Sequence, residues 1–142
     1  MRTRIAALAA AVLLAGGVLA TASPASAAPA PPQGSWDHTW TTSDAAHGGT
    51  VYVEEHGDTV SLCDTAADGY APRAEVFSEG TDGLYHARYI ITASGGFASC
   101  TGYSASNGGV YDLPEGVEIL VEIWLGPNVG HDGTSHYFLN DH

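Results

Sequence analysis

The aromatic side chains are the residues of this chain that are best suited to binding chemistry. Trp36, His38 and Trp40 alternate along WDHTWTT, so an extended strand would place them on one face, about 6.7 Å apart per step. A flat aromatic row can stack on sugar rings. The alternative is that Trp36 and Trp40 anchor the strand to the core, because large aromatic side chains supply much of the burial in a small domain. Trp124 is the third candidate ligand-binding residue.

Two carboxylates share a strand with Trp124. Glu118 and Glu122 lie on one face of VEILVEIWL, four residues and therefore about 13 Å apart. Glycosidase carboxylates are separated by roughly 5 to 9.5 Å, so this pair alone is too far apart for that reaction. We interpret both as charges on a solvated outer face. Leu120 and Trp124 share the face, which is unusual for a purely solvated surface.

The segment DTAADGYAPRAE resembles a calcium-binding loop. Asp64, Asp68 and Glu75 occupy loop positions 1, 5 and 12, and a glycine occupies position 6. Ala66 stands at position 3, where the pattern needs an oxygen ligand. The alternative is a turn in which Asp64 and Asp68 bond to their own backbone. We favour the turn, and we expect no cofactor.

Other catalytic and metal-binding motifs are incomplete. Residues 102–106 (GYSAS) resemble a nucleophile elbow but have Ser106 where the second glycine is needed. The seven histidines match no zinc-binding spacing, and His131 and His136 fall on opposite faces of an extended segment. We interpret them as scattered surface residues.

The charge of the chain restricts its partners. The 142 residues carry 4 Lys+Arg and 16 Asp+Glu, for a formal net charge of −12. Such a chain gains nothing from releasing counterions on a phosphate backbone, so nucleic acid is a poor partner. A basic helix on a membrane surface is excluded for the same reason.

The first 27 residues read as a signal peptide. MRTR is a short positive segment, residues 5–20 are apolar, and Ala25 and Ala27 form an A-x-A cleavage site. We expect cleavage after Ala27, secretion, and no membrane contact afterwards. Residues 28–34 are proline-rich and predict a disordered lead-in. Residues 35–142 then form a single domain.

The domain reads as short strands separated by Gly- and Asp-rich breakers. Without crossover helices, such strands predict an all-β fold, a small antiparallel β-sandwich or barrel. Gly57-Asp58 predicts a two-residue hairpin turn that pairs Val53 with Leu62 and Glu55 with Val60. The expected strands are residues 36–42, 50–56, 59–63, 73–78, 84–92, 117–125 and 136–139.

The two cysteines predict one disulfide. In an oxidising compartment Cys63 and Cys100 are expected to pair, and the bridge encloses 36 residues. The chain-entropy model gives about 3–4 kcal/mol of stabilisation for a loop of that size. In the expected hairpin Cys63 points away from the face of Val60 and Leu62. Either the strand has ended there, or both of its faces are covered.

Three short motifs carry a resemblance to a known group. They are CDTAADG at 63–69, the later Cys100, and PEGV at 114–117. Together they resemble small secreted single-disulfide proteins of actinobacteria of the Streptomyces type. The resemblance implies a β-rich exported domain with a disulfide. That group has no established activity, so it implies no catalytic residue.

These observations favour a secreted, non-catalytic and monomeric module that binds an extracellular ligand, either carbohydrate or protein. One alternative is a small secreted hydrolase whose carboxylates come together from different strands. The other is an inhibitor or toxin that acts on a protein partner through a loop such as residues 101–109.

Overall fold

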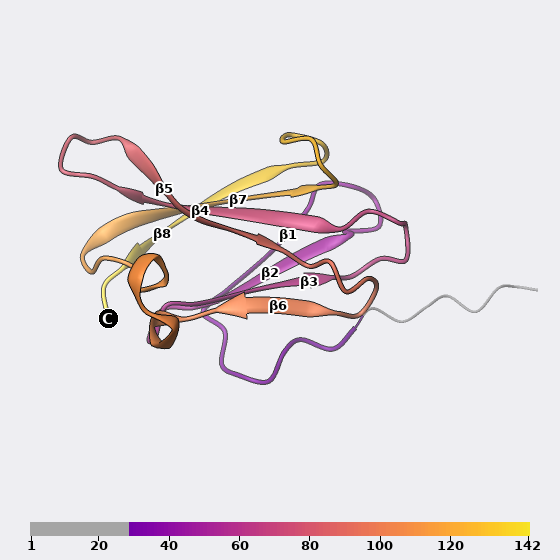
Figure 1. Ribbon diagram of the computed structural model, residues 1–142, viewed down its shortest axis with the longest axis horizontal. Helices are drawn as coiled ribbons and strands as arrows, with labels where there is room; N and C mark the ends of the chain where they lie inside the picture. Colours follow the sequence, from indigo (N-terminus) through magenta and orange to yellow (C-terminus); the bar gives the residue numbers. More distant parts are fainter. Residues whose placement is uncertain (1–28) are drawn as a thin grey trace, which may run out of the picture.

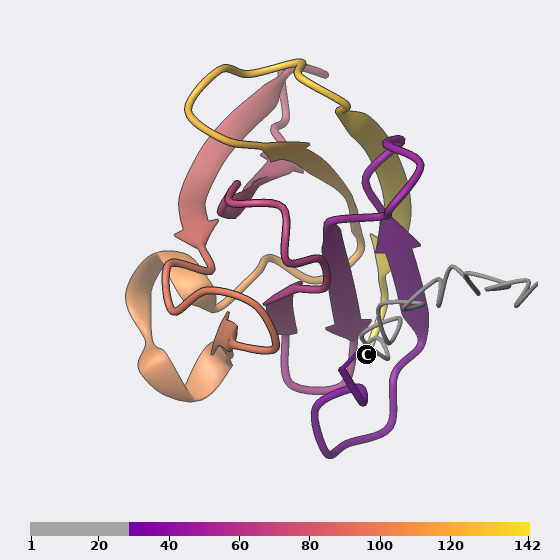
Figure 2. The ribbon, with the colours of Figure 1, turned by 90° about the vertical axis from the view of Figure 1, so that its right-hand side faces the viewer.

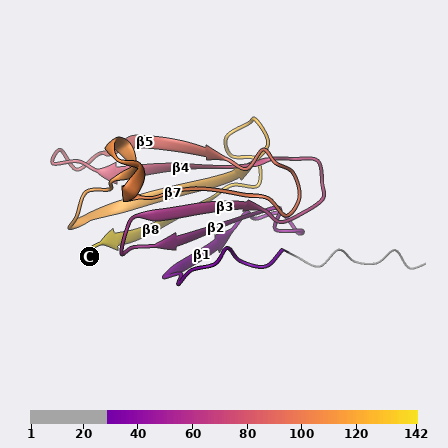
Figure 3. The same ribbon diagram turned by 60° about the horizontal axis from the view of Figure 1, so that its bottom comes forward.

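The computed structural model describes residues 29–142 and shows two four-stranded antiparallel sheets packed face to face (Figures 1 and 3). The fold is therefore a β-sandwich, one of the two architectures that the sequence predicts. The expected signal peptide lies outside the described residues.

Each sheet combines strands from separate parts of the chain. The first sheet has the order β1 (His38–Thr41), β2 (Gly49–Glu54), β3 (Thr59–Asp64) and β6 (Cys100–Tyr103). The second sheet has the order β5 (Tyr85–Thr92), β4 (Pro72–Glu79), β7 (Val117–Leu125) and β8 (Thr134–Asn140). Two short 3₁₀ helices, η1 (Ala105–Asn107) and η2 (Gly109–Tyr111), lie between β6 and β7.

The core lies between the sheets and follows from the alternation of apolar residues along the strands. Each strand directs every second side chain inward. The apolar area that this buries stabilises the fold by about 25 cal/mol per Å². The first sheet contributes Val51, Val53, Val60 and Leu62. The facing side chains of the second sheet are Ala74, Val76, Tyr89, Ile91, Ile119, Val121, Ile123 and Phe138.

The hairpin register differs from the sequence prediction by two residues. β2 and β3 pair Val53 with Val60 and leave a four-residue connection, residues 55–58, instead of a two-residue turn. Asp58 explains the difference: its buried carboxylate accepts bonds from the Leu113 N–H at 2.9 Å and the Asn140 side-chain amide at 3.0 Å. These contacts fix Asp58 in the connection, and Glu55 and His56, which the prediction placed in the ladder, join the connection instead. A shift of two residues keeps every side chain on its predicted face, so Val60 and Leu62 still share one face, and that face points into the core.

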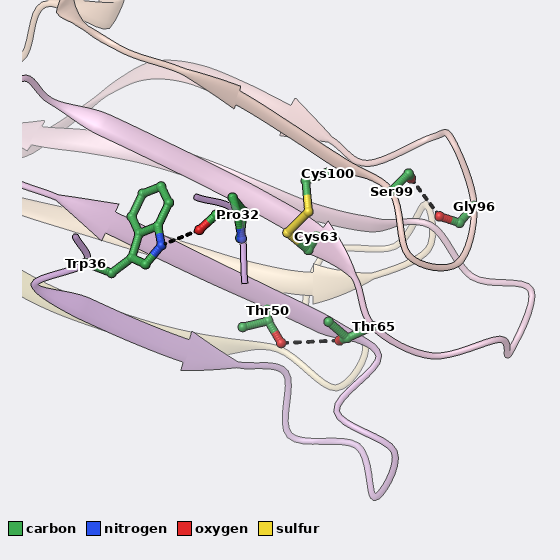
Figure 4. The surroundings of a disulfide bond; sticks show 8 residues. All are labelled: Pro32, Trp36, Thr50, Cys63, Thr65, Gly96, Ser99 and Cys100. Atoms are coloured by element: carbon green, nitrogen blue, oxygen red, sulfur yellow. Dashed lines mark hydrogen bonds between the residues drawn. A yellow bond between two sulfur atoms is a disulfide. The ribbon is translucent and has the colours of Figure 1, made fainter. Parts of the chain in front are cut away.

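The disulfide joins the neighbouring strands β3 and β6, as Figure 4 shows. Cys63 and Cys100 are direct cross-strand partners with Cα atoms 4.0 Å apart, so the predicted pairing is confirmed. Cys63 belongs to β3 and is buried, which means that the strand continues and that both of its faces are covered. Strand β6 itself was not predicted. Glycine is favoured at its position 102, because a Cβ atom there would lie 3.1 Å from the carbonyl oxygen of Val60, which is a tight contact.

Aromatic side chains close the two long edges of the sandwich. At the edge of β1 and β8 the Trp40 ring stacks on His136, with centroids 4.7 Å apart. At the opposite edge Tyr89, Tyr103 and Tyr111 form a cluster, in which Tyr103 and Tyr111 stack at 4.3 Å. Figure 2 shows the two 3₁₀ helices at this second edge, far from β1 and β8.

No helix within residues 29–142 is long and apolar enough to cross a membrane. A disulfide in a domain this small is consistent with an extracellular location.

Candidate binding face

The outer side of the second sheet carries apolar and acidic side chains that no other part of the described chain covers completely. We call it the open face. It consists of the residues of β4, β5, β7 and β8 that alternate with the core residues: Arg73, Glu75, Phe77, Glu79, Tyr85, Ala87, Ile90, Thr92, Glu118, Leu120, Glu122, Trp124, Ser135, Tyr137 and Leu139.

A pair of carboxylates lies at the centre of the open face. Glu75 on β4 is the direct cross-strand partner of Glu122 on β7, and Ile90 flanks Glu75 on its other side. Partial burial, and next the negative charge of Glu122, raise the pKa of Glu75 above its ordinary value. The Ser135 hydroxyl, 3.4 Å away, donates to Glu122. Like charges directly opposite each other destabilise a sheet, so this pair is present in spite of its cost in stability.

The neighbouring row across the face is apolar. Phe77, Leu120 and Tyr137 are successive partners on β4, β7 and β8. The Tyr85 ring meets the Tyr137 ring edge to face, with centroids 5.7 Å apart, and its hydroxyl donates a hydrogen bond to Glu118. That bond, more than any other cause, raises the pKa of Tyr85 to about 12. Leu120 is only 7% exposed although it lies on the outer side of the sheet.

Three large apolar side chains of the open face remain accessible to solvent. Ile90 is 54% exposed, Tyr137 is 52% exposed and Leu139 is 53% exposed. They lie beside Glu75, Leu120 and Glu118 respectively in the strand register. Apolar groups and carboxylates are therefore interleaved over one continuous surface, an arrangement that suits contact with another molecule.

A small pocket opens at the end of the face near the β7–β8 connection. It has a volume of about 160 Å³, and its lining includes Glu122, Trp124, Val129 and Thr134. Trp124 is 2% exposed, so it contributes packing more than contact area. Sites that enclose a small molecule usually measure about 300–1,000 Å³. The face thus fits a larger partner lying across it better than a small molecule held inside it.

The three tryptophans expected to bind a ligand lie at separate places. Trp36 precedes β1, packs against Tyr52 on the outer side of the first sheet with ring centroids 5.6 Å apart, and donates its indole N–H to the Pro32 carbonyl at 2.9 Å (Figure 4). Trp40 packs against the core and stacks on His38 at 4.9 Å. Only Trp124 belongs to the open face. The predicted row is therefore formed by His38 and Trp40, which stack on each other, and not by Trp36.

The residues of the calcium-like loop do not form a ligand cluster. Asp64 ends β3 and is buried, which is the main cause of its raised pKa. Asp68 caps the backbone N–H of Tyr70 at 2.8 Å, as the turn interpretation predicts. Glu75 lies on the open face beside Glu122. Within residues 29–142, the one group of three or more His, Cys, Asp or Glu side chains with ligand atoms within 4.8 Å of one another is Glu55, Asp141 and His142.

Sequence reasoning missed two groupings that tertiary structure creates. The partners Glu75 and Glu122 are 47 positions apart (122 − 75), and no spacing rule joins them. The histidines were interpreted as scattered, yet His38 and His142 both contact Glu55. The elbow-like segment, by contrast, places the Ser104 hydroxyl 2.7 Å from that of Ser106.

Comparison with known proteins identifies no relative, since no family model, curated protein or solved structure matches this chain.

Proposed function

We propose that this protein is a secreted, non-catalytic module that binds an extracellular protein through the open face. The observation that carries the proposal is the exposure of Ile90, Tyr137 and Leu139 beside the carboxylates of Glu75, Glu118 and Glu122. Secretion rests on the signal-like first 27 residues and on the disulfide. The resemblance to small secreted actinobacterial proteins points to the same compartment.

The shape of the aromatic groups favours a protein partner over a carbohydrate. Sugar rings stack on flat, exposed aromatic surfaces, whereas Trp124 is buried and Tyr85 meets Tyr137 at 61°. Aliphatic groups such as Leu139 suit the apolar core of a protein interface, and tyrosine is enriched in such interfaces.

The charge of the face indicates a basic partner. Within the described part of the chain, every ion pair shorter than 4.0 Å uses a histidine as its cation. The carboxylates of Glu75 and Glu122 therefore face each other without an arginine or lysine partner. A lysine or arginine supplied by another protein would relieve their repulsion, and complementary charge also speeds association.

The test uses affinity capture from culture supernatant, followed by titration of the purified captured protein. Changing Tyr137 and Leu139 together to serine should weaken binding of the captured protein at least tenfold. Added salt should weaken its binding to the unmodified protein. Thr39→Ala is the matched control, because Thr39 is exposed on the first sheet. Equal binding by the double variant, or hits on a glycan array without any captured protein, would overturn the proposal.

A second candidate function is glycoside hydrolysis, which the Glu75–Glu122 pair specifically favours. Direct cross-strand partners have Cβ atoms about 4.5–5.5 Å apart, so side-chain rotation can bring the two carboxyl groups to the separation of about 5–5.5 Å that retaining glycosidases use. The raised pKa of Glu75 is the property that a general acid needs, and Glu122 would then be the nucleophile.

Release of reducing sugar from polysaccharides and aryl glycosides tests this candidate. Glu75→Gln and Glu122→Gln should each lower the rate at least a hundredfold, while Leu139→Ser, on the same face, should leave it unchanged. Absence of turnover by the unmodified protein removes the candidate.

A further inference from the structure

A cluster of histidines and carboxylates lies at the opposite end of the sandwich from the pocket. It gathers His38 at the start of β1, Glu55 in the β2–β3 connection, and Asp141 and His142 after β8. The C-terminus lies beside the β2–β3 connection in Figures 1 and 3. Three segments that are distant in sequence thus bring donor atoms to one place.

The distances converge on Glu55. His38 Nε2 lies 2.5 Å from Glu55 Oε1, and His142 Nε2 lies 3.3 Å from Glu55 Oε2. Asp141 lies nearer the other ring nitrogen, with 3.5 Å between His142 Nδ1 and Asp141 Oδ1, but one ligand atom from each of Glu55, Asp141 and His142 lies within 4.8 Å of the other two. Ligand atoms around a tetrahedral zinc ion, each about 2.0–2.1 Å from the metal, are themselves about 3.3 Å apart. The spacing around Glu55 and His142 is therefore already close to that of a coordination sphere.

A buried hydrogen bond holds the two halves of the cluster together. Asn140 is fully buried and donates to Asp58 at 3.0 Å. Asn140 directly precedes Asp141, and Asp58 belongs to the same connection as Glu55. The Glu55 backbone N–H also donates to the Asp37 carboxylate at 2.8 Å. Donors from the C-terminal segment and from the β2–β3 connection are thus positioned by the folded domain before any ligand binds.

The composition of the cluster suits a divalent transition metal. Imidazole nitrogen together with carboxylate oxygen is a donor set that zinc prefers, whereas calcium takes oxygen ligands alone. The Glu55 side chain is 11% exposed, and histidines are its ion-pair partners among the described residues. A cation here would neutralise carboxylates in a chain of net charge −12.

We propose that Glu55, Asp141 and His142 form a divalent metal site that takes zinc, with His38 orienting Glu55. His38 contacts the oxygen of Glu55 that faces away from His142, the arrangement by which ligating carboxylates are fixed by a further hydrogen bond. The His56 ring, 6.2 Å from that of His142, lies close enough for a side-chain rotation to add a fourth ligand. Three protein ligands otherwise leave one position for water.

Calorimetric titration of the untagged protein with zinc chloride at pH 7.4 tests the site. We expect one ion per chain and weaker binding at pH 5.5, since protons compete for the imidazole nitrogens. His142→Ala should weaken binding at least tenfold, and His38→Gln should weaken it less. A cobalt-substituted sample should show the strong visible absorption of low-coordinate cobalt, which His142→Ala should abolish.

The control is His86→Ala. His86 lies 3.0 Å from Asp82 and so forms a matched exposed histidine–carboxylate pair, but one without a third ligand. This variant should bind zinc as tightly as the unmodified protein does. Absence of heat at several hundred micromolar zinc, or an equal loss of affinity in His142→Ala and His86→Ala, would overturn the proposal. A variant at residue 142 also lies beyond the last strand, so misfolding would not confuse the result.

Discussion

The outer faces of the two sheets differ in the large side chains that they leave exposed, although both come from alternating strands. On the first sheet the outward side chains of β2 and β3 include Thr50, Tyr52, Ser61 and Cys63, and all four are buried. On the second sheet the outward Leu120 and Trp124 of the central strand β7 are buried as well. Ile90, Tyr137 and Leu139, on the edge strands β5 and β8, are all more than half exposed. Being outward on a strand therefore does not by itself decide exposure.

The difference arises from the place of each strand in its sheet and from what covers each face. Trp36 packs against Tyr52 on the first sheet, and the Cys63–Cys100 bridge ties β3 to β6 on the same side. No comparable cover within residues 29–142 lies over Tyr137 and Leu139. One face is thus used for stability, and the other is left with apolar groups in contact with water, which is the condition for binding a partner.

The largest expected effect is on the covered face. Replacing Cys63 and Cys100 together by alanine should lower the free energy of unfolding by about 3–4 kcal/mol, because the open chain regains the entropy of a 36-residue loop. Urea denaturation of the double variant measures the change, and the reduced unmodified protein should behave in the same way. A loss well below 1 kcal/mol would mean that the first sheet holds its face closed without the bridge.

A matched pair of tyrosine substitutions makes the sharpest comparison of the faces. Tyr52→Ala should cost about 2–4 kcal/mol, since a nearly buried ring loses its packing against Trp36 and leaves a cavity. Tyr137→Ala, on the open face, should change stability by about 0.5 kcal/mol or less. Both are measured as shifts in the urea midpoint at constant slope. Equal costs would show that the two faces do not differ in the way described.

The smallest expected effect concerns the carboxylate pair. Glu75→Gln should stabilise the protein by about 0.2–1 kcal/mol at pH 7, because it removes like charges that face each other across β4 and β7. Glu115→Gln is the control, since Glu115 is exposed in the loop before β7.

The pH dependence of the stability gained by Glu75→Gln follows from the direction in which the pKa of Glu75 is shifted. The pKa of Glu75 is raised above 4.5, so the folded state holds that proton more tightly than the unfolded state does. The contribution of Glu75 to stability is therefore most favourable below pH 4.5 and declines as the pH rises through the raised pKa. The difference between Glu75→Gln and the unmodified protein should shrink as the pH falls from 7 to 4. A constant difference would indicate that neither partial burial nor the charge of Glu122 raises the pKa of Glu75.

The limits of sequence reasoning are clearest at the β2–β3 connection. The alternation of apolar residues correctly predicted that Val60 and Leu62 share one face of their strand, because side-chain period along a strand is a local property. The register was wrong by two residues, because Asp58 bonds to Leu113 and Asn140, which are 55 and 82 positions away. Hydrogen bonds between residues so far apart in the chain leave no pattern in the sequence around Asp58.

By itself, the sequence determined the all-β class, the Cys63–Cys100 pairing, and the first and last residues of the strand Val117–Leu125. Each depends on local alternation or on the presence of only two cysteines. Only the tertiary structure decided which outward residues are covered, that Glu75 faces Glu122, and that His142 reaches Glu55. These groupings depend on which strands become neighbours and on how the two sheets pack. That choice is made by the burial of the whole core, and no short segment carries it.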